Sequence, residues 1–163
     1  MRRTLTRLDP RTVTIVLLVE AGLLKLAAMG GNDPDGIVRG AYPMAVTRAS
    51  ASGRAVLDRT IVHIEDTSAD PEYTISLRDL LGSRSLLSVP IFREGTPVGV
   101  ISVWRGEARP FTDKQIALLQ TFTEQAVIAI ENVRLFTELE ARNAELRVSL
   151  EQQTATGEIL RVI

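Results

Sequence analysis

Few side chains in this sequence have the types and spacing that catalysis or metal binding requires. The chain has 163 residues, one histidine (His63) and no cysteine. It therefore has no disulfide framework, no thiol nucleophile and no thiolate metal site. One histidine cannot build a multi-histidine metal site, and no nucleophile is paired with a base as in a catalytic triad. Kinase, cyclase and phosphate-loop signatures are absent, so the sequence predicts no catalytic residues, no metal site and no identifiable cofactor.

His63 and the acidic stretch that follows it are the remaining candidates for chemistry. His63 lies between β-branched residues, in a pattern typical of a strand. A phosphoacceptor histidine is instead exposed on a helix beside an acidic residue, so a structural or pocket-edge role is favoured here. Asp66, Asp70 and Glu72 could hold a cation, but their spacing is not that of an EF-hand. A solvated loop that caps the next helix is the favoured interpretation.

The charge pattern excludes some classes of partner. The net charge is −1, and the 19 Lys and Arg residues are scattered rather than clustered. This distribution argues against nucleic acid or an anionic membrane as a partner. Thr12–Met29 is apolar but carries Glu20 and Lys25 around a turn signal at Gly22, so two strands explain it better than a transmembrane helix. The cytoplasm is the default compartment.

Short strands and helices alternate through the first two thirds of the chain. Strands are predicted at Thr12–Val19, Leu23–Met29, Ile61–Ile64, Ser85–Phe92 and Pro97–Trp104. Helices are predicted at Ser50–Arg59, with Ser50 or Ser52 as cap, and at Ile75–Leu81, ended by Gly82. Arg93–Thr96 has the composition of a hairpin turn, and residues 37–48 carry no clear signal. This order predicts an α+β fold with a mostly antiparallel central sheet flanked by helices.

One long helix is predicted from Thr112 to Ile163. Thr112 and Gln115 have the T-x-x-Q spacing of a capping box, with Phe111 before the cap. Apolar residues then recur at helical spacing and mark one buried face: Ile116, Leu119, Ala126, Ile130 and Val133. At about 1.5 Å per residue the helix is far longer than a small domain can cover. Its first half therefore packs on a domain, and its second half needs a partner.

Past Phe136 the helix carries a heptad pattern, which we call the seam. Its a and d positions are occupied by Phe136, Leu139, Asn143, Leu146 and Leu150. Asparagine at an a position is a device that fixes register, whereas Arg142 and Arg147 would repel each other in a parallel pair. Two interpretations remain open: a two-stranded coiled coil in a homodimer, or an amphipathic helix packed on a following domain of the same chain.

Several stretches resemble GAF domains of bacterial multidomain signalling proteins. They are residues 52–66, 70–73, 84–105 and 109–136; the core V-P-I-F-R-E-G-T-P-V-G-V-I spans residues 89–101. The segment at residues 109–136 is similar to GAF modules of sensor histidine kinases and of adenylate or guanylate cyclases; it reads R-P-F-T-D-K-Q-I-A-L-L-Q-T-F-T-E-Q-A-V-I-A-I-E-N-V-R-L-F. The resemblance implies a short N-terminal segment at 1–11, a GAF-like domain at 12–133 and a linker helix at 134–163. Residues 149–163 resemble the linker to a next module, which implies a downstream signalling domain of the same or a related chain.

By the same resemblance, a pocket for an unknown small molecule lies on the sheet beneath the loop and short helices. Its expected lining is Tyr73, Arg84, Ser85, Ser102 and Trp104. The implied function is a noncatalytic sensory or regulatory domain, as in two-component systems, with the long helix as its output. A structural dimerisation module without a ligand and a nonfunctional remnant are the alternatives. A GAF-like enzyme such as free methionine sulfoxide reductase is disfavoured, because that chemistry uses cysteines.

Overall fold

A six-stranded antiparallel sheet is the centre of the fold in the computed structural model, which describes residues 12–33, 35–75 and 78–163. The strands lie in the order β3-β2-β1-β6-β5-β4. Their bounds are β1 Thr12–Glu20, β2 Leu23–Gly30, β3 Met44–Ala45, β4 Val62–Ile64, β5 Ser85–Arg93 and β6 Thr96–Arg105. Every pairing is antiparallel. The predicted α+β class and antiparallel sheet are thus confirmed.

Two tight hairpins set the register of the four long strands. Ala21 and Gly22 both have positive φ between the paired residues Glu20 and Leu23. Glu94 and Gly95 do the same between Arg93 and Thr96. Two consecutive positive φ angles match the twist of the flanking strands, which favours this turn in hairpins. The two strands predicted within Thr12–Met29 are therefore confirmed, and no helix among the described residues combines the length and hydropathy of a membrane span.

Short helices cover one face of the sheet. They are α1 Ile37–Gly40, α2 Ala51–Asp58, the 3₁₀ turn η1 Thr67–Ala69 and α3 Arg78–Leu81. Ser50 caps α2 by accepting a hydrogen bond from the Gly53 N–H at 3.0 Å, so the predicted cap is confirmed. The helix predicted at Ile75–Leu81 is shorter than expected, since Ile75 is not helical and residues 76–77 lie outside the described part; Gly82 follows it with φ of 57°. The predicted N-terminal segment 1–11 also lies outside the described residues.

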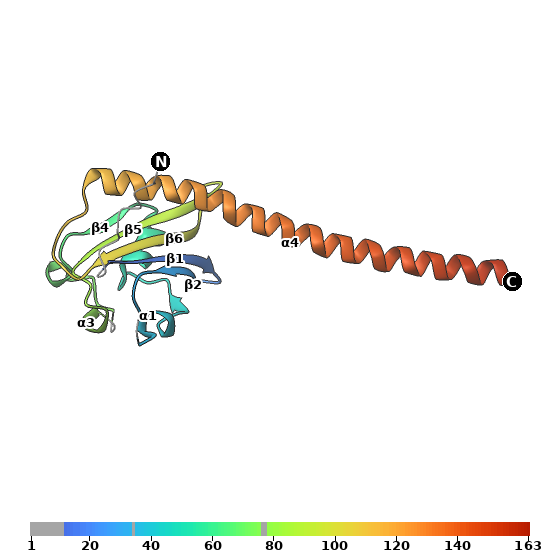
Figure 1. The fold of residues 1–163 in the computed structure, drawn as a ribbon, viewed down its shortest axis with the longest axis horizontal. Helices are drawn as coiled ribbons and strands as arrows, with labels where there is room; N and C mark the ends of the chain where they lie inside the picture. Colours follow the sequence, from blue (N-terminus) through green and yellow to red (C-terminus); the bar gives the residue numbers. More distant parts are fainter. Residues whose placement is uncertain (1–11, 34, 76–77) are drawn as a thin grey trace, which may run out of the picture. The chain divides into compact units, whose positions relative to one another are not determined.

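The long helix α4 runs from Asp113 to Val162, over 50 residues. Its capping box is formed: the Gln115 side chain accepts from the Thr112 N–H at 3.0 Å, and Thr112 Oγ1 accepts from the Gln115 N–H at 3.3 Å. Figure 1 shows the first turns of α4 on the opposite side of the sheet from α1 and α3. The predicted start and extent of this helix are confirmed.

By compactness the chain divides into two units, Met1–Gln125 and Ala126–Ile163, and α4 contributes to both. In the first unit Leu119 is buried, as the predicted apolar face requires. In the second unit Val133 is 68% exposed, so the expectation that the buried face continues to this residue is wrong. Val133 belongs to the second unit, apart from the compact unit that contains the sheet. The predicted division into residues 12–133 and 134–163 stays a prediction.

Candidate functional site

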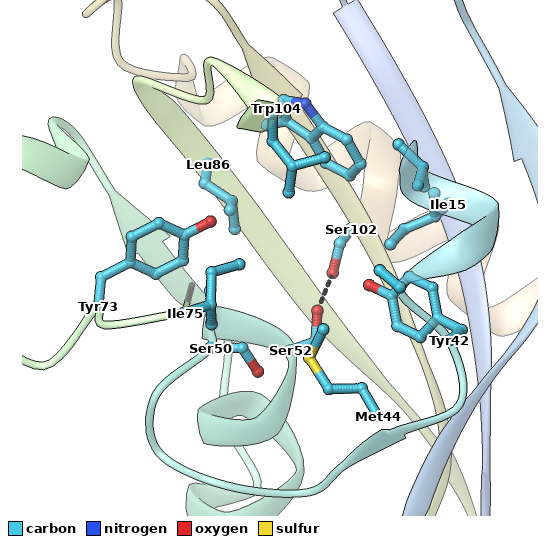
Figure 2. Close-up of a pocket in the computed structure, with 14 residues that line it drawn as sticks. Ile15, Tyr42, Met44, Ser50, Ser52, Tyr73, Ile75, Leu86, Ser102 and Trp104 are labelled. Carbon is cyan, nitrogen blue, oxygen red and sulfur yellow. Dashed lines mark hydrogen bonds between the residues drawn. The ribbon is translucent and has the colours of Figure 1, made fainter. Parts of the chain in front are cut away.

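A pocket lies on the face of the sheet that the short helices cover. Its floor is made by Ile15 of β1, Leu86 of β5, and Ser102 and Trp104 of β6. Its walls come from α1, α2, α3 and the segments between them: Val38, Ala41, Tyr42, Met44, Ser50, Ala51, Ser52, Tyr73, Ile75 and Leu81. Figure 2 shows Ser52 and Ser102 meeting near the middle of this group, with Trp104 and Ile15 on one side and Met44 on the other.

Three of the five predicted pocket residues come together here, and two do not. Tyr73, Ser102 and Trp104 line the pocket. Ser85 is fully buried, but it precedes the pocket residue Leu86 on β5 and so points to the other face of the sheet, where it donates to the Glu65 carbonyl at 2.6 Å. Arg84 stands just before β5 and pairs with Asp66 outside the pocket. The prediction placed the right strands together but not the right face of β5.

Tyr42, Met44 and Ser52 are pocket residues that the sequence did not predict. Tyr42 and Met44 fall within residues 37–48, where no pattern indicated an element. The sequence predicts Ser50 or Ser52 as the helix cap; Ser50 fills that role, and the Ser52 hydroxyl bonds to Ser102 on the sheet. Burial, and then the neighbouring Tyr73 hydroxyl, raise the pKa of Tyr42 above its ordinary value, so its phenol stays protonated at neutral pH.

A chain of three serine hydroxyls crosses the floor of the pocket. Ser52 Oγ lies 2.8 Å from Ser102 Oγ, and Ser102 Oγ lies 2.7 Å from Ser88 Oγ. Ser88 and Ser102 are directly paired across β5 and β6, so they share a face of the sheet. All three residues are buried. Two of them, Ser52 and Ser102, line the cavity and give its mainly apolar lining polar groups at the floor.

The pocket is nearly filled by its own side chains. Its cavity volume is about 30 Å³, which is room for roughly two or three water molecules. Pockets that hold drug-sized ligands are about 300 Å³ or larger. In this conformation the cavity therefore admits water or a small group, and a larger molecule requires its wall to rearrange.

The carboxylates of the acidic loop, Asp66, Asp70 and Glu72, form ion pairs with arginines. The Arg54 side chain is only 9% exposed, and its Nη1 donates to Asp70 Oδ2 at 3.0 Å. Glu72 pairs with Arg48 at 3.0 Å, and Asp66 accepts from the Ser68 N–H as the cap of η1. No cluster of three or more metal-ligating side chains occurs in the described ranges. The carboxylates thus tie the loop to α2 and to the residue before β5, and they cap its turns.

The Asp66–Arg84 pair should make stability depend on acid pH. Hydrogen bonds from Arg84, then from the Ser68 N–H, lower the pKa of Asp66 from its ordinary value to about 2. Because the folded pKa lies below the unfolded one, the stabilisation is full above about pH 4 and is lost as the pH falls toward about 2. As the pH falls across this range, the melting temperature of Arg84→Gln should fall less than that of the parent. Arg161→Gln, with the same change in charge, should lose as much melting temperature as the parent does. Equal slopes of melting temperature against pH for all three proteins would contradict a stabilising Asp66–Arg84 pair.

His63 does not line this pocket and instead contacts Phe111, the residue before the α4 cap. Its Nε2 accepts a hydrogen bond from the Phe111 N–H at 3.0 Å, and its ring meets the Phe111 ring edge-on at 5.9 Å between centroids. On the other side, the Arg105 guanidinium lies 4.1 Å from the centre of the Phe111 ring. Phe111 is itself buried. The residue before the α4 cap is therefore held by the last residue of β6 and the middle residue of β4.

The predicted seam residues lie in the second unit with their side chains open. Leu139 and Leu146 are 57% and 61% exposed, and Phe136, Leu150 and Asn143 are exposed as well. The helix is continuous through all of them. This stretch is thus an amphipathic helix whose apolar stripe has no cover within the described chain.

The fold has many solved counterparts. A GAF domain/HD domain protein from Geobacter sulfurreducens is similar with a TM-score of 0.66 and 18% identity, over 78% of this chain and 84% of that one. Residues 122 to 287 of a methyl-accepting chemotaxis protein are similar with a TM-score of 0.63 and 25% identity, over 77% and 80%. A type II free methionine-R-sulfoxide reductase from Thermoplasma acidophilum is similar with a TM-score of 0.57 and 23% identity, over 71% and 76%.

Sequence comparison gives the family. No curated protein matches the chain significantly. Residues 2–131, most of the chain, match the sequence model of a family described as GAF domain. GAF domains are a sensory and regulatory fold of signalling proteins. The antiparallel sheet and the long C-terminal helix agree with this match. The chain therefore belongs to the GAF domain family.

Proposed function

We propose that this GAF domain is a noncatalytic sensory or regulatory module that passes a small-molecule or conformational signal through a dimeric C-terminal helix to an output domain. The observation that carries the proposal is the position of β6. Ser102 and Trp104 on this strand line the pocket, and Arg105, the next residue, contacts the residue before the α4 cap. Because neighbouring residues of one strand face opposite sides of the sheet, a shift of β6 at the pocket moves the start of α4 as well.

The proposed output is a homodimer through the seam. Counting back in sevens from Leu139 and Phe136 places Leu118 at a d position and Phe122 at an a position. These two residues of the first unit are 57% and 51% exposed, although both are large and apolar. The a and d positions between them and Phe136 hold Gln125, Ala129 and Asn132, so the continuous apolar seam begins at Phe136. The two exposed apolar residues lie in line with that seam and support a two-stranded assembly. Asn143 meets its own copy only when the two helices are parallel and in register, so we propose that arrangement.

The proposed partner of the module is an output domain of a sensor histidine kinase or a nucleotide cyclase. The support is the likeness of residues 109–136 to GAF modules of such proteins. The similar solved structures include part of a methyl-accepting chemotaxis protein and a GAF domain/HD domain protein, which is consistent with a module joined to other domains. The output acts in the cytoplasm, where such kinase and cyclase domains work.

A noncatalytic role is supported by the side chains present. The fold also occurs in a methionine-R-sulfoxide reductase, so the fold alone does not decide between enzyme and sensor. This chain has no cysteine to act as a redox thiol. Its one histidine is engaged with Phe111 rather than with a nucleophile. The small cavity favours one alternative, a dimerisation module that binds no ligand.

Native mass spectrometry of the purified chain tests this function. The expected species is a dimer that carries an additional noncovalent mass, which is lost on denaturation. A dimer without added mass, from both gentle purification and purification with cell extract added back, would favour the dimerisation module. A monomer at tens of micromolar protein would contradict the proposed output.

A further inference from the structure

The serine chain on the pocket floor has one more proton than it uses. Three hydroxyls carry three protons, and the chain makes two hydrogen bonds, Ser52 with Ser102 and Ser102 with Ser88. None of the three hydroxyls bonds to any other group in the described part of the chain. One O–H donor is therefore left over in a buried place.

The geometry limits where this spare proton points. If the bonds run from Ser88 through Ser102, the spare donor is on Ser52; if both neighbours donate to Ser102, it is on Ser102. Both of these residues line the cavity. The third arrangement leaves the spare donor on Ser88, which is fully buried and outside the pocket lining. An unpaired buried donor costs about 1–3 kcal/mol, so the first two arrangements are preferred.

The cavity thus presents a hydrogen-bond donor to whatever occupies it. The same cavity offers no charged partner among its described lining residues, which are apolar apart from serines and two tyrosines. Burying an ion without a partner is far more costly than burying a neutral polar group. A carboxylate, a phosphate or an ammonium group is therefore a poor ligand for this cavity, whereas a neutral hydrogen-bond acceptor is a suitable one.

We propose that the ligand of this pocket is a small uncharged molecule that accepts one hydrogen bond from Ser52 or Ser102 and packs an apolar body against Ile15, Leu86 and Trp104. The proposal rests on the sensory function above and adds the chemical class of the signal. A ketone, a lactone or an ester carries such an acceptor. Met44, a flexible side chain of the wall, can change rotamer to make room for the apolar body.

Matched aromatic probes test the class directly. Acetophenone has a neutral acceptor, ethylbenzene has nearly the same shape without one, and benzoate carries a charged one. Binding of each to the full chain is followed by saturation-transfer NMR and by fluorescence of Trp104, the only tryptophan. Acetophenone is expected to bind at millimolar concentration, and benzoate is expected not to bind.

Serine variants then locate the donor. Either single alanine variant leaves the other cavity-lining hydroxyl with an unused proton, so both must be removed. The double variant Ser52→Ala/Ser102→Ala should lower the affinity for acetophenone relative to ethylbenzene by roughly three- to tenfold, the worth of one hydrogen bond. Ser149→Ala, on the exposed side of α4, should leave this ratio unchanged. If this double variant does not fold, as judged by circular dichroism, Ser52→Ala/Ser102→Cys keeps the test valid, because a thiol fills the serine site but is only a weak donor.

Three outcomes would overturn the proposal. They are benzoate binding as tightly as acetophenone, no binding of any probe at millimolar concentration, and an unchanged affinity ratio in every folded serine variant. The second outcome would make the cavity a site for buried water only. None of these outcomes bears on whether native mass spectrometry finds the expected dimer, so failure of the ligand class is distinguished from failure of the proposed output.

Discussion

Gly53→Ala is expected to destabilise the domain severely. A Cβ atom at Gly53 would lie 1.9 Å from the Thr47 carbonyl oxygen and 2.8 Å from the Thr47 nitrogen. Both are backbone atoms, so the clash can be relieved only by moving α2 away from the segment before it. Overpacking of this kind belongs to the small set of changes that cost about 4 kcal/mol or more. Urea denaturation followed by circular dichroism measures the loss.

The effect should reach the pocket, because Gly53 follows the pocket residue Ser52. A matched control is Gly157→Ala, where the new methyl group meets nothing within 4 Å. That change lies inside α4 and should stabilise the helix by roughly 0.5–1 kcal/mol. A Gly53→Ala variant as stable as the parent would show that α2 does not pack on Thr47 as described.

The double variant Leu139→Asp/Leu146→Asp is expected to convert the proposed dimer to a monomer. Each leucine would be buried against its copy in the seam, and each aspartate would place a charge there without a partner. An unpaired buried charge costs several kcal/mol, so the dissociation constant should rise by at least about a hundredfold. Sedimentation velocity across a concentration series measures the shift.

The domain itself should remain folded in this variant. Both leucines lie in the second unit and are exposed within the chain, so their replacement removes no contact from the sheet or the pocket. Trp104 fluorescence should therefore match that of the parent. Val148→Asp, on the outer side of the helix, introduces a charge without touching the seam and should leave the dimer intact. A double variant that stays fully dimeric would rule out this seam.

Local signals explain why so much of the fold was predicted. The capping box at Thr112, the Ser50 cap and the glycine turn at Gly95 each act within a few residues, so the sequence pattern alone identifies them. The paired strands followed from β-branched runs on either side of such turns. The long helix followed from apolar periodicity without a break.

What the sequence missed depends on contacts between distant residues. Ser85 is predicted to line the pocket, but the pairing of β5 with β6 places it on the other face of the sheet. Tyr42 lines the pocket, but it lies in a segment without hydrophobic periodicity, so no local sequence pattern indicates the position of its ring. The bond between His63 and the Phe111 N–H joins residues 48 positions apart. Tertiary packing decides each of these.

The central claim is that the C-terminal helix forms a parallel, in-register pair, and cysteine crosslinking tests it most directly. The chain has no cysteine, so a single introduced thiol is its only site for a disulfide. In a parallel pair Asn143→Cys places the two thiols opposite each other, within reach of a bond. Val148→Cys, on the outer side of the helix, keeps them apart.

Under mild oxidation the account predicts a rapid covalent dimer of the Asn143→Cys variant and almost none of the Val148→Cys variant, on a non-reducing gel. Crosslinking of Asn143→Cys that is no faster than that of Val148→Cys would contradict the parallel seam and, with it, the proposed path of the signal.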